Sequence, residues 1–168
     1  MKHALGRLVY MGSSKTVRCL ILACGNTLRS DDGVGTRLAE WAEERFRTNG
    51  DVRVVARQQW TPDLAEDIAA VESVLFVDSS IKSPPGHVHL DPVEPQENHN
   101  GSATHHLDAH ELLGLASELY GSRSIHSMLL TVGAGSTELG ESFSDRVEAA
   151  LPRARGVLEK AVLRFLGN

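Results

Sequence analysis

Apolar and polar positions along the chain follow two alternating patterns. Short apolar runs are typical of strands buried in a parallel sheet, and apolar residues spaced three or four apart are typical of amphipathic helices. The predicted strands are residues 17–23, 51–58, 74–78, 87–90 and 127–132, and the predicted helices are residues 33–47, 62–70, 108–120 and 144–166. This order predicts an α/β fold with three layers, αβα, around a mainly parallel central sheet of about five strands.

The regular pattern has one clear beginning and one long interruption. It starts at Val17, so we expect residues 1–16 to be a poorly ordered N-terminal extension and residues 17–168 to form a single domain. Residues 79–106 are rich in proline, glycine and polar side chains and hold only the short strand predicted at 87–90. A connection of this length in a compact domain is more often functional than incidental. The helix that follows has a sequence signature for its start, because Asp108 and Glu111 have the spacing of a capping box.

Composition and charge narrow the classes of function. Among 168 residues, 17 basic and 22 acidic side chains give a net charge of −5, so we predict no nucleic-acid partner. No apolar run approaches the roughly 20 residues that cross a bilayer, so we predict no membrane association. Cys19 and Cys24 would lie on opposite faces of one strand, where they cannot form a disulfide. Unpaired thiols favour a cytoplasmic protein.

Candidate chemistry gathers where the predicted strands end. Ligands of open parallel sheets bind beyond the carboxyl ends of the strands, which selects the loops after residues 17–23, 74–78 and 127–132. Asp31 and Asp32 follow the first of these strands, Asp78 ends another, and His105 and His106 close the long connection. Each carboxylate could simply cap a helix. Two carboxylates and one imidazole could instead bind a divalent ion such as zinc or nickel with open positions, and the residues alone leave His105 and His106 as alternatives.

Other catalytic motifs are missing or weak. Ser79 and Ser80 follow Asp78 without a G-x-S-x-G elbow, and the chain has no H-E-x-x-H, G-x-G-x-x-G or Walker pattern. Cys24 is expected to be an inert core thiol rather than a nucleophile. Three glycines near the first loop are expected to permit a tight turn and close packing of a helix on the sheet: Gly25, Gly33 and Gly35.

Four segments, in order, resemble one family. They are GNTLRSDDGVG at 25–35, VLFVD at 74–78, ATHHLDAHELLGLASELYG at 103–121 and TVGAGSTELGESFSDRVEAALPRA at 131–154. Together they are similar to the hydrogenase maturation endopeptidases. The first segment departs from the family pattern, because Ala23 and Cys24 stand before Gly25 where members usually have G-x-G-N. Many members also carry glutamate in place of Asp32, and residues 1–16 have no counterpart.

The resemblance implies an activity and a site. Members are α/β proteins that remove a C-terminal extension from the large-subunit precursor of a NiFe hydrogenase after nickel insertion. Carried over by motif, the metal contacts and catalytic residues would be Asp32, Asp78 and His105, with nickel supplied by the precursor. His105 is chosen because T-H-H-L matches the family's T-H-x-L at its first histidine, and His106 is the reserve. Asp31 would be a structural cap for the following helix. The expected partner is the precursor, and we expect the protein to be a monomer.

Two other classes of function are weighed against this one. Peptidyl-tRNA hydrolases also place a G-x-G-N turn after a first strand, but their N-P-G and H-N-x-G motifs are missing and the acidic charge disfavours tRNA. A small non-enzymatic module that binds a metal or another ligand would use the same strand ends. Tight binding of nickel without any substrate would favour that second class.

Overall fold

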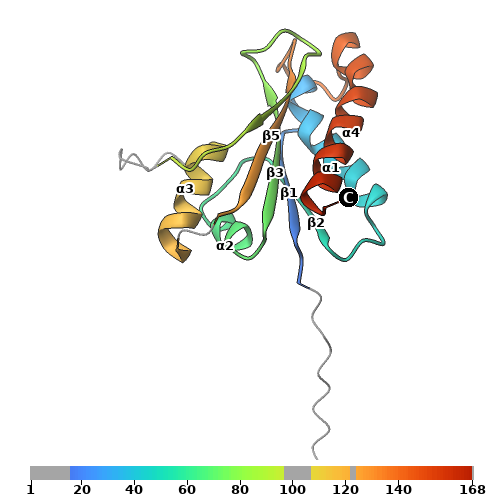
Figure 1. Cartoon of the computed structure of the whole chain (residues 1–168). Helices are drawn as coiled ribbons and strands as arrows, with labels where there is room; N and C mark the ends of the chain where they lie inside the picture. The colour runs from blue at the N-terminus through green and yellow to red at the C-terminus, as the bar shows by residue number, and fades with distance from the viewer. Residues whose placement is uncertain (1–15, 97–106, 122–123, 168) are drawn as a thin grey trace, which may run out of the picture.

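The computed structural model describes residues 16–96, 107–121 and 124–167 (Figure 1). The strands are β1 (Cys19–Cys24), β2 (Val52–Arg57), β3 (Ser73–Ser80), β4 (Val88–Pro92) and β5 (His126–Gly133). The helices are the short 3-10 helix η1 (Ser30–Gly33) and the α-helices α1 (Val34–Arg45), α2 (Leu64–Ala69), α3 (Ala109–Tyr120) and α4 (Asp145–Phe165). The predicted N-terminal extension lies almost entirely outside the described residues, and the assignment of residues 17–168 to one domain stays a prediction.

The five strands form one mixed sheet in the order β2-β1-β3-β5-β4. The first four are parallel, and β4 pairs antiparallel with β5 at one edge. From β1 the chain adds β2 on one side and β3 on the other, so the strand order reverses between β1 and β3. Crevices at such reversals are where ligands bind in α/β sheets.

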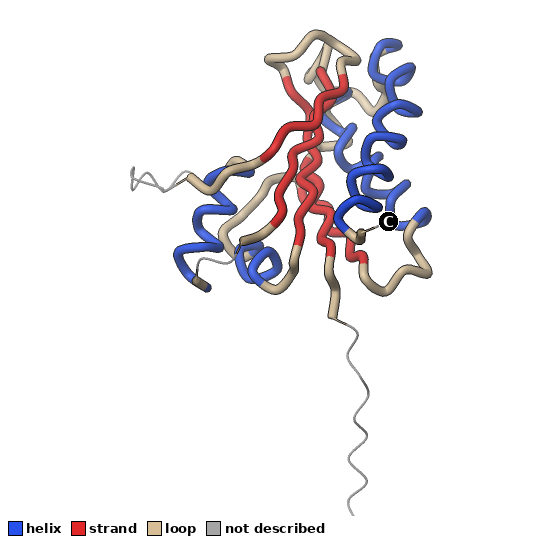
Figure 2. Tube along the Cα trace, in the orientation of Figure 1, coloured by secondary structure: helices blue, strands red, loops and turns tan. Residues whose placement is uncertain are grey.

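Helices cover both faces of the sheet, which confirms the predicted α/β fold with a mostly parallel sheet. Figure 2 shows α2 and α3 on one side of the strands and α1 and α4 on the other. Each face has its own apolar core. Cys19 lies in the core beneath α1 and α4, whereas Cys24 packs against the core beneath α2 and α3. Both cysteines are free, as predicted from their opposite faces. No helix in the described residues is long and apolar enough to span a bilayer.

Local signals set the starts of two elements near the sheet edge. Asp108 caps α3 with the predicted capping box: its Oδ1 accepts from Glu111 N at 2.9 Å, and its own N donates to Glu111 Oε2 at 2.9 Å. Gly35, in the first turn of α1, faces the backbone of β1 and β3 so closely that a Cβ would overlap Cys24 O and lie 3.1 Å from Val77 O. The predicted close packing of helix on sheet is therefore confirmed at this glycine.

Candidate functional site

A cavity of about 510 Å³ lies at the carboxyl ends of the strands, beside the reversal of strand order. Segments from four parts of the chain line it. The residues are Cys24, Arg29, Asp32, Gln58, Gln59, Trp60, Asp78, Ser79, Ile81, Leu107, Asp108 and Glu111. Two of the predicted site residues, Asp32 and Asp78, therefore share one cavity, although 46 positions separate them in the sequence.

Each carboxylate oxygen of Asp32 accepts one hydrogen bond. The loop after β1 turns back at η1, so that Asn26 N donates to Asp32 Oδ2 at 3.2 Å. Ser79 Oγ, from the adjacent strand, donates to Asp32 Oδ1 at 3.1 Å. The carboxylate of Asp32 is therefore fixed between the first loop and the end of β3, in a pocket where it remains able to accept further contacts.

Asp78 lies next to Ser79 on β3 and is more buried than a typical carboxylate. Its Oδ1 accepts from Ser79 N at 2.8 Å. Burial raises the pKa of Asp78, the Ser79 N–H lowers it in part, and the negative charge of Asp32 raises it again, so that the pKa is about 7. Ser79 thus contacts both carboxylates, through its hydroxyl to Asp32 and its amide to Asp78. This serine was considered in the sequence only as a weak nucleophile candidate.

Cys24 ends β1 on the floor of the same cavity. Its Sγ lies 3.3 Å from Gln58 O. Burial, and then the negative charges of Asp78 and Asp32, raise the pKa of the thiol to about 12. A thiol this far from ionisation is a poor nucleophile at neutral pH, in agreement with the inert role predicted for it. Cys24 is nevertheless only partly buried and lines the cavity, so its predicted place inside the core was wrong.

Asp31 has a different role from the one that we predicted. It does not cap α1, whose N-cap is Gly33 and has no side-chain cap. Its fully buried carboxylate instead accepts from Gly135 N at 2.7 Å, Ser136 N at 3.1 Å, Ser144 N at 2.7 Å and Ser144 Oγ at 2.8 Å. Burial alone would raise the pKa of Asp31, but these hydrogen bonds outweigh it and hold the pKa below its ordinary value. Asp31 is structural, as expected, but it joins η1 to the loop after β5.

The third predicted ligand lies outside the described residues, as does its reserve, His106. Within the described ranges, no group of three His, Cys, Asp or Glu side chains has the geometry of a metal site. The first described residue after this gap is Leu107, which is two positions after His105 and lines the cavity. Asp32 and Asp78 therefore lie in one cavity, whereas their role as metal contacts and the contribution of a histidine stay predictions.

Sequence reasoning missed the wall of the cavity that β2 contributes. Gln58, Gln59 and Trp60 follow this strand directly. The Trp60 ring packs edge-on against Phe76, with the ring centroids 5.2 Å apart. Because β2 is parallel to β1, its carboxyl end falls at the same sheet edge, and the strand-end rule applied to β2 would have found this wall.

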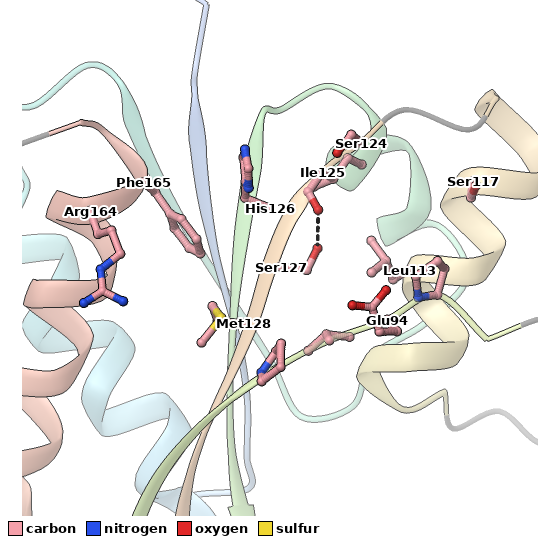
Figure 3. A pocket seen from close by; sticks show the side chains of 13 residues that line it. Glu94, Leu113, Ser117, Ser124, Ile125, His126, Ser127, Met128, Arg164 and Phe165 are labelled. Atoms are coloured by element: carbon pink, nitrogen blue, oxygen red, sulfur yellow. Dashed lines mark hydrogen bonds between the residues drawn. The ribbon is translucent and has the colours of Figure 1, made fainter.

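A second and larger cavity lies away from the predicted residues. It has a volume of about 690 Å³ and lies beside the first residues of β5, the end of α4 and one flank of α3 (Figure 3). Its ionisable side chains, Glu94, His126 and Arg164, come from three separate segments, and the one hydrogen bond drawn in Figure 3 joins Ser127 to Ile125. Among the described residues that line it, Glu94 is the only one with a carboxylate. The smaller cavity is therefore the better candidate for chemistry.

Neither a scan against protein-family models nor a search of curated proteins gives a match. Solved structures do match. The NiFe hydrogenase maturation protease HybD from Thermococcus kodakarensis is 26% identical, with a TM-score of 0.64 over 86% of this chain and 98% of that one. HycI from Thermococcus kodakarensis KOD1, also a NiFe hydrogenase maturation protease, is 26% identical, with a TM-score of 0.64 over 92% and 96% of the two chains.

The chain has the fold of the NiFe hydrogenase maturation proteases. The resemblance found in the sequence is therefore confirmed by structural neighbours that cover most of the chain. The hydrogenase maturating endopeptidase HybD from E. coli has the same fold at 23% identity, with a TM-score of 0.65 over 89% of this chain and 94% of that one. This third neighbour supports the fold alone.

Proposed function

We propose that the protein is an endopeptidase that removes the C-terminal extension from the large-subunit precursor of a NiFe hydrogenase after nickel insertion. The observation that carries this proposal is the pairing of Asp32 and Asp78 in one cavity of a chain with the maturation-protease fold. We further propose that Asp32, Asp78 and His105 contact nickel that the precursor carries. The two free cysteines are consistent with processing in the cytoplasm.

The donor chemistry of the cavity suits a divalent ion. Two carboxylates supply oxygen atoms, and an imidazole would add one nitrogen, which is a set that nickel and zinc accept. The two carboxylates also repel each other, since the charge of Asp32 raises the pKa of Asp78. A cation placed between them would relieve this repulsion. A bound divalent ion supplies Lewis-acid polarisation of a carbonyl or a water molecule.

The residues of the chain would orient the substrate and handle protons. Ser79 fixes the positions of the two carboxylates relative to each other, because it donates a hydrogen bond to each. Without a cation Asp78, with a pKa of about 7, is partly protonated near neutral pH, and a cation held by Asp78 would favour loss of this proton and leave the carboxylate as a ligand. Three ligands that do not saturate an ion bind it weakly alone, so cleavage would depend on a precursor that already holds nickel.

The test compares nickel-loaded with nickel-free precursor. Wild-type protein should cut only the loaded form, and Asp32→Asn, Asp78→Asn and His105→Ala should each lower kcat/KM by at least ~100-fold. Asp91→Asn, on β4, and His126→Ala, at the amino end of β5, are matched controls and should retain activity. Equal cutting of the two precursor forms, or full activity in the three site variants, would exclude the proposal. Stoichiometric nickel binding without precursor would favour a metal-binding module.

A further inference from the structure

Three large apolar side chains are exposed on the loops that surround the candidate cavity. Leu28 follows β1, Ile81 follows β3 and Leu139 follows β5, and their exposed fractions are 54%, 77% and 88%. We call these three residues the apolar rim. The other exposed large apolar residues in the described ranges are Leu119 and Tyr120, at the far end of α3 from the cavity. Three of these five exposed large apolar side chains therefore lie on loops that follow the carboxyl ends of strands, the end of the sheet that holds the cavity.

One residue of the apolar rim lines the cavity, and the other two lie on segments next to its lining. Ile81 lines the cavity itself, and so does Arg29, the residue after Leu28. Leu28 and Leu139 lie on adjacent segments, because Gly140 N donates to Leu28 O at 3.0 Å and Arg29 and Gly140 form a β-bridge. Figure 1 shows the loops after β3 and β5 at the same end of the sheet. A protein bound in the cavity would therefore also meet the rim.

Hydrogen bonds hold two of the rim loops in place. Ser30, between Leu28 and the buried Asp31, adopts a left-handed backbone with φ of 46°. Its N donates to Gly140 O at 2.7 Å and its Oγ donates to Glu138 O at 3.1 Å. Arg29 Nε donates to Thr137 O at 3.0 Å. Because the loops are already ordered, a partner would lose little binding energy in fixing them.

On the basis of the proposed function, we infer that the apolar rim is the docking surface for the folded body of the precursor whose extension is cut in the cavity. The surface of the precursor that contacts the rim would be apolar. It would lie next to the point where the C-terminal extension emerges from the folded body of the precursor. Three side chains cannot supply the roughly 800 Å² that each partner buries in a stable complex. So small a contact area suits a substrate that must dissociate after cleavage better than it suits a permanent dimer of this chain.

The experiment uses a triple variant, Leu28→Ser with Ile81→Ser and Leu139→Ser, and a control, Leu119→Ser with Tyr120→Ser. The control removes the same kind of exposed apolar surface far from the cavity. The KM for nickel-loaded precursor, and its Kd measured by biolayer interferometry, should both rise at least ~10-fold in the triple variant. The kcat should be retained in the single variants Leu28→Ser and Leu139→Ser, which leave the cavity lining intact. The control should match the wild type. The three single variants check that any loss follows the removed side chains and is not a general unfolding.

The outcomes separate this inference from the proposed function. If the wild type cuts the precursor and the triple variant has unchanged KM and Kd, the docking inference is wrong and the proposed function stands. If the wild type binds the precursor without cutting it, and the triple variant binds more weakly, the docking surface stands and the protease activity is wrong. A dimer of the wild type that the triple variant loses, measured by sedimentation velocity, would assign the rim to a second copy and overturn the inference.

Discussion

The carboxylate of Asp31 accepts two hydrogen bonds from Ser144, one from its backbone N at 2.7 Å and one from its hydroxyl at 2.8 Å. Ser144 is the N-cap residue of α4, and Asp31 lies in η1, beside the proposed catalytic residue Asp32. A single buried carboxylate thus connects the first wall of the candidate cavity with the start of the last helix. These hydrogen bonds hold η1, the segment that also carries Asp32, against the start of α4.

Asp31→Ala should destabilise the fold strongly. It would leave the Gly135, Ser136 and Ser144 donors without their acceptor, which predicts a loss of about 3–5 kcal/mol in the free energy of unfolding by urea. Because the pKa of Asp31 is lowered in the folded state, its contribution is complete at neutral pH and is lost as pH falls below about 4. The difference in the free energy of unfolding between the wild type and Asp31→Ala should therefore become smaller as pH falls below about 4. Glu138→Gln, exposed in the same loop, should leave stability unchanged.

Asp78→Asn should make the protein more stable at alkaline pH. The folded state of the wild type keeps the Asp78 proton up to about pH 7, whereas the unfolded chain releases it near pH 4. The wild type therefore loses stability as pH rises between these values, by an amount on the order of 4 kcal/mol. In thermal unfolding at pH 4, 6 and 8, the Tm of the variant should rise relative to the Tm of the wild type as the pH increases. A constant difference across this range would show that burial and Asp32 do not perturb this carboxyl.

Cys24 should react slowly with iodoacetamide in the native protein. Its pKa of about 12 leaves almost no thiolate at pH 8, whereas the unfolded chain should be alkylated orders of magnitude faster. Asp78→Asn removes one of the charges that raise this pKa, so it should speed the alkylation of Cys24 several-fold. Peptide mass spectrometry separates Cys24 from Cys19, whose thiol is buried in the other core. Equal rates in wild type and variant would show that access alone limits the reaction.

Gly35→Ala and Gly156→Ala should have opposite effects. A Cβ on Gly35 would overlap Cys24 O and press on the backbone of β3, which should destabilise the fold by at least ~2 kcal/mol. Gly156 lies within α4, and apart from its chain neighbours and the backbone of its own helix no atom lies within 4 Å of the position of a Cβ. Alanine there should stabilise the helix by roughly 0.5–1 kcal/mol. Chemical unfolding of the two variants measures both values, and a stable Gly35→Ala would argue against close packing of α1 on the sheet.

Most of the secondary structure could be predicted because its signals are local. The capping box that starts α3 needs only Asp108 and Glu111, which are three residues apart. The predicted strand at 51–58 is β2 (Val52–Arg57), and the predicted helix at 144–166 is α4 (Asp145–Phe165), each within one residue at both ends. The meeting of Asp32 and Asp78 was also predictable, since parallel strands bring their carboxyl ends to one edge.

The errors and omissions come from contacts between distant parts of the chain. Nothing in the residues around Asp31 indicates that its partners lie at 135–144, so the local interpretation as a helix cap was the natural one and was wrong. Ser79 could not be recognised as a support for both carboxylates until the strand order was known. The wall formed by Gln58, Gln59 and Trp60 was missed because the strand-end rule was applied to three strands and not to β2.

The contact between Asp31 and Ser144 also sets an order for folding. The two residues are 113 positions apart, and contacts of such high sequence separation form slowly because they close a long loop. During synthesis, η1 leaves the ribosome long before the serine that fixes it. The cleft that holds Asp32 therefore takes its final form only after Ser144 has been made, so a growing chain that ends before this serine would lack the complete cleft.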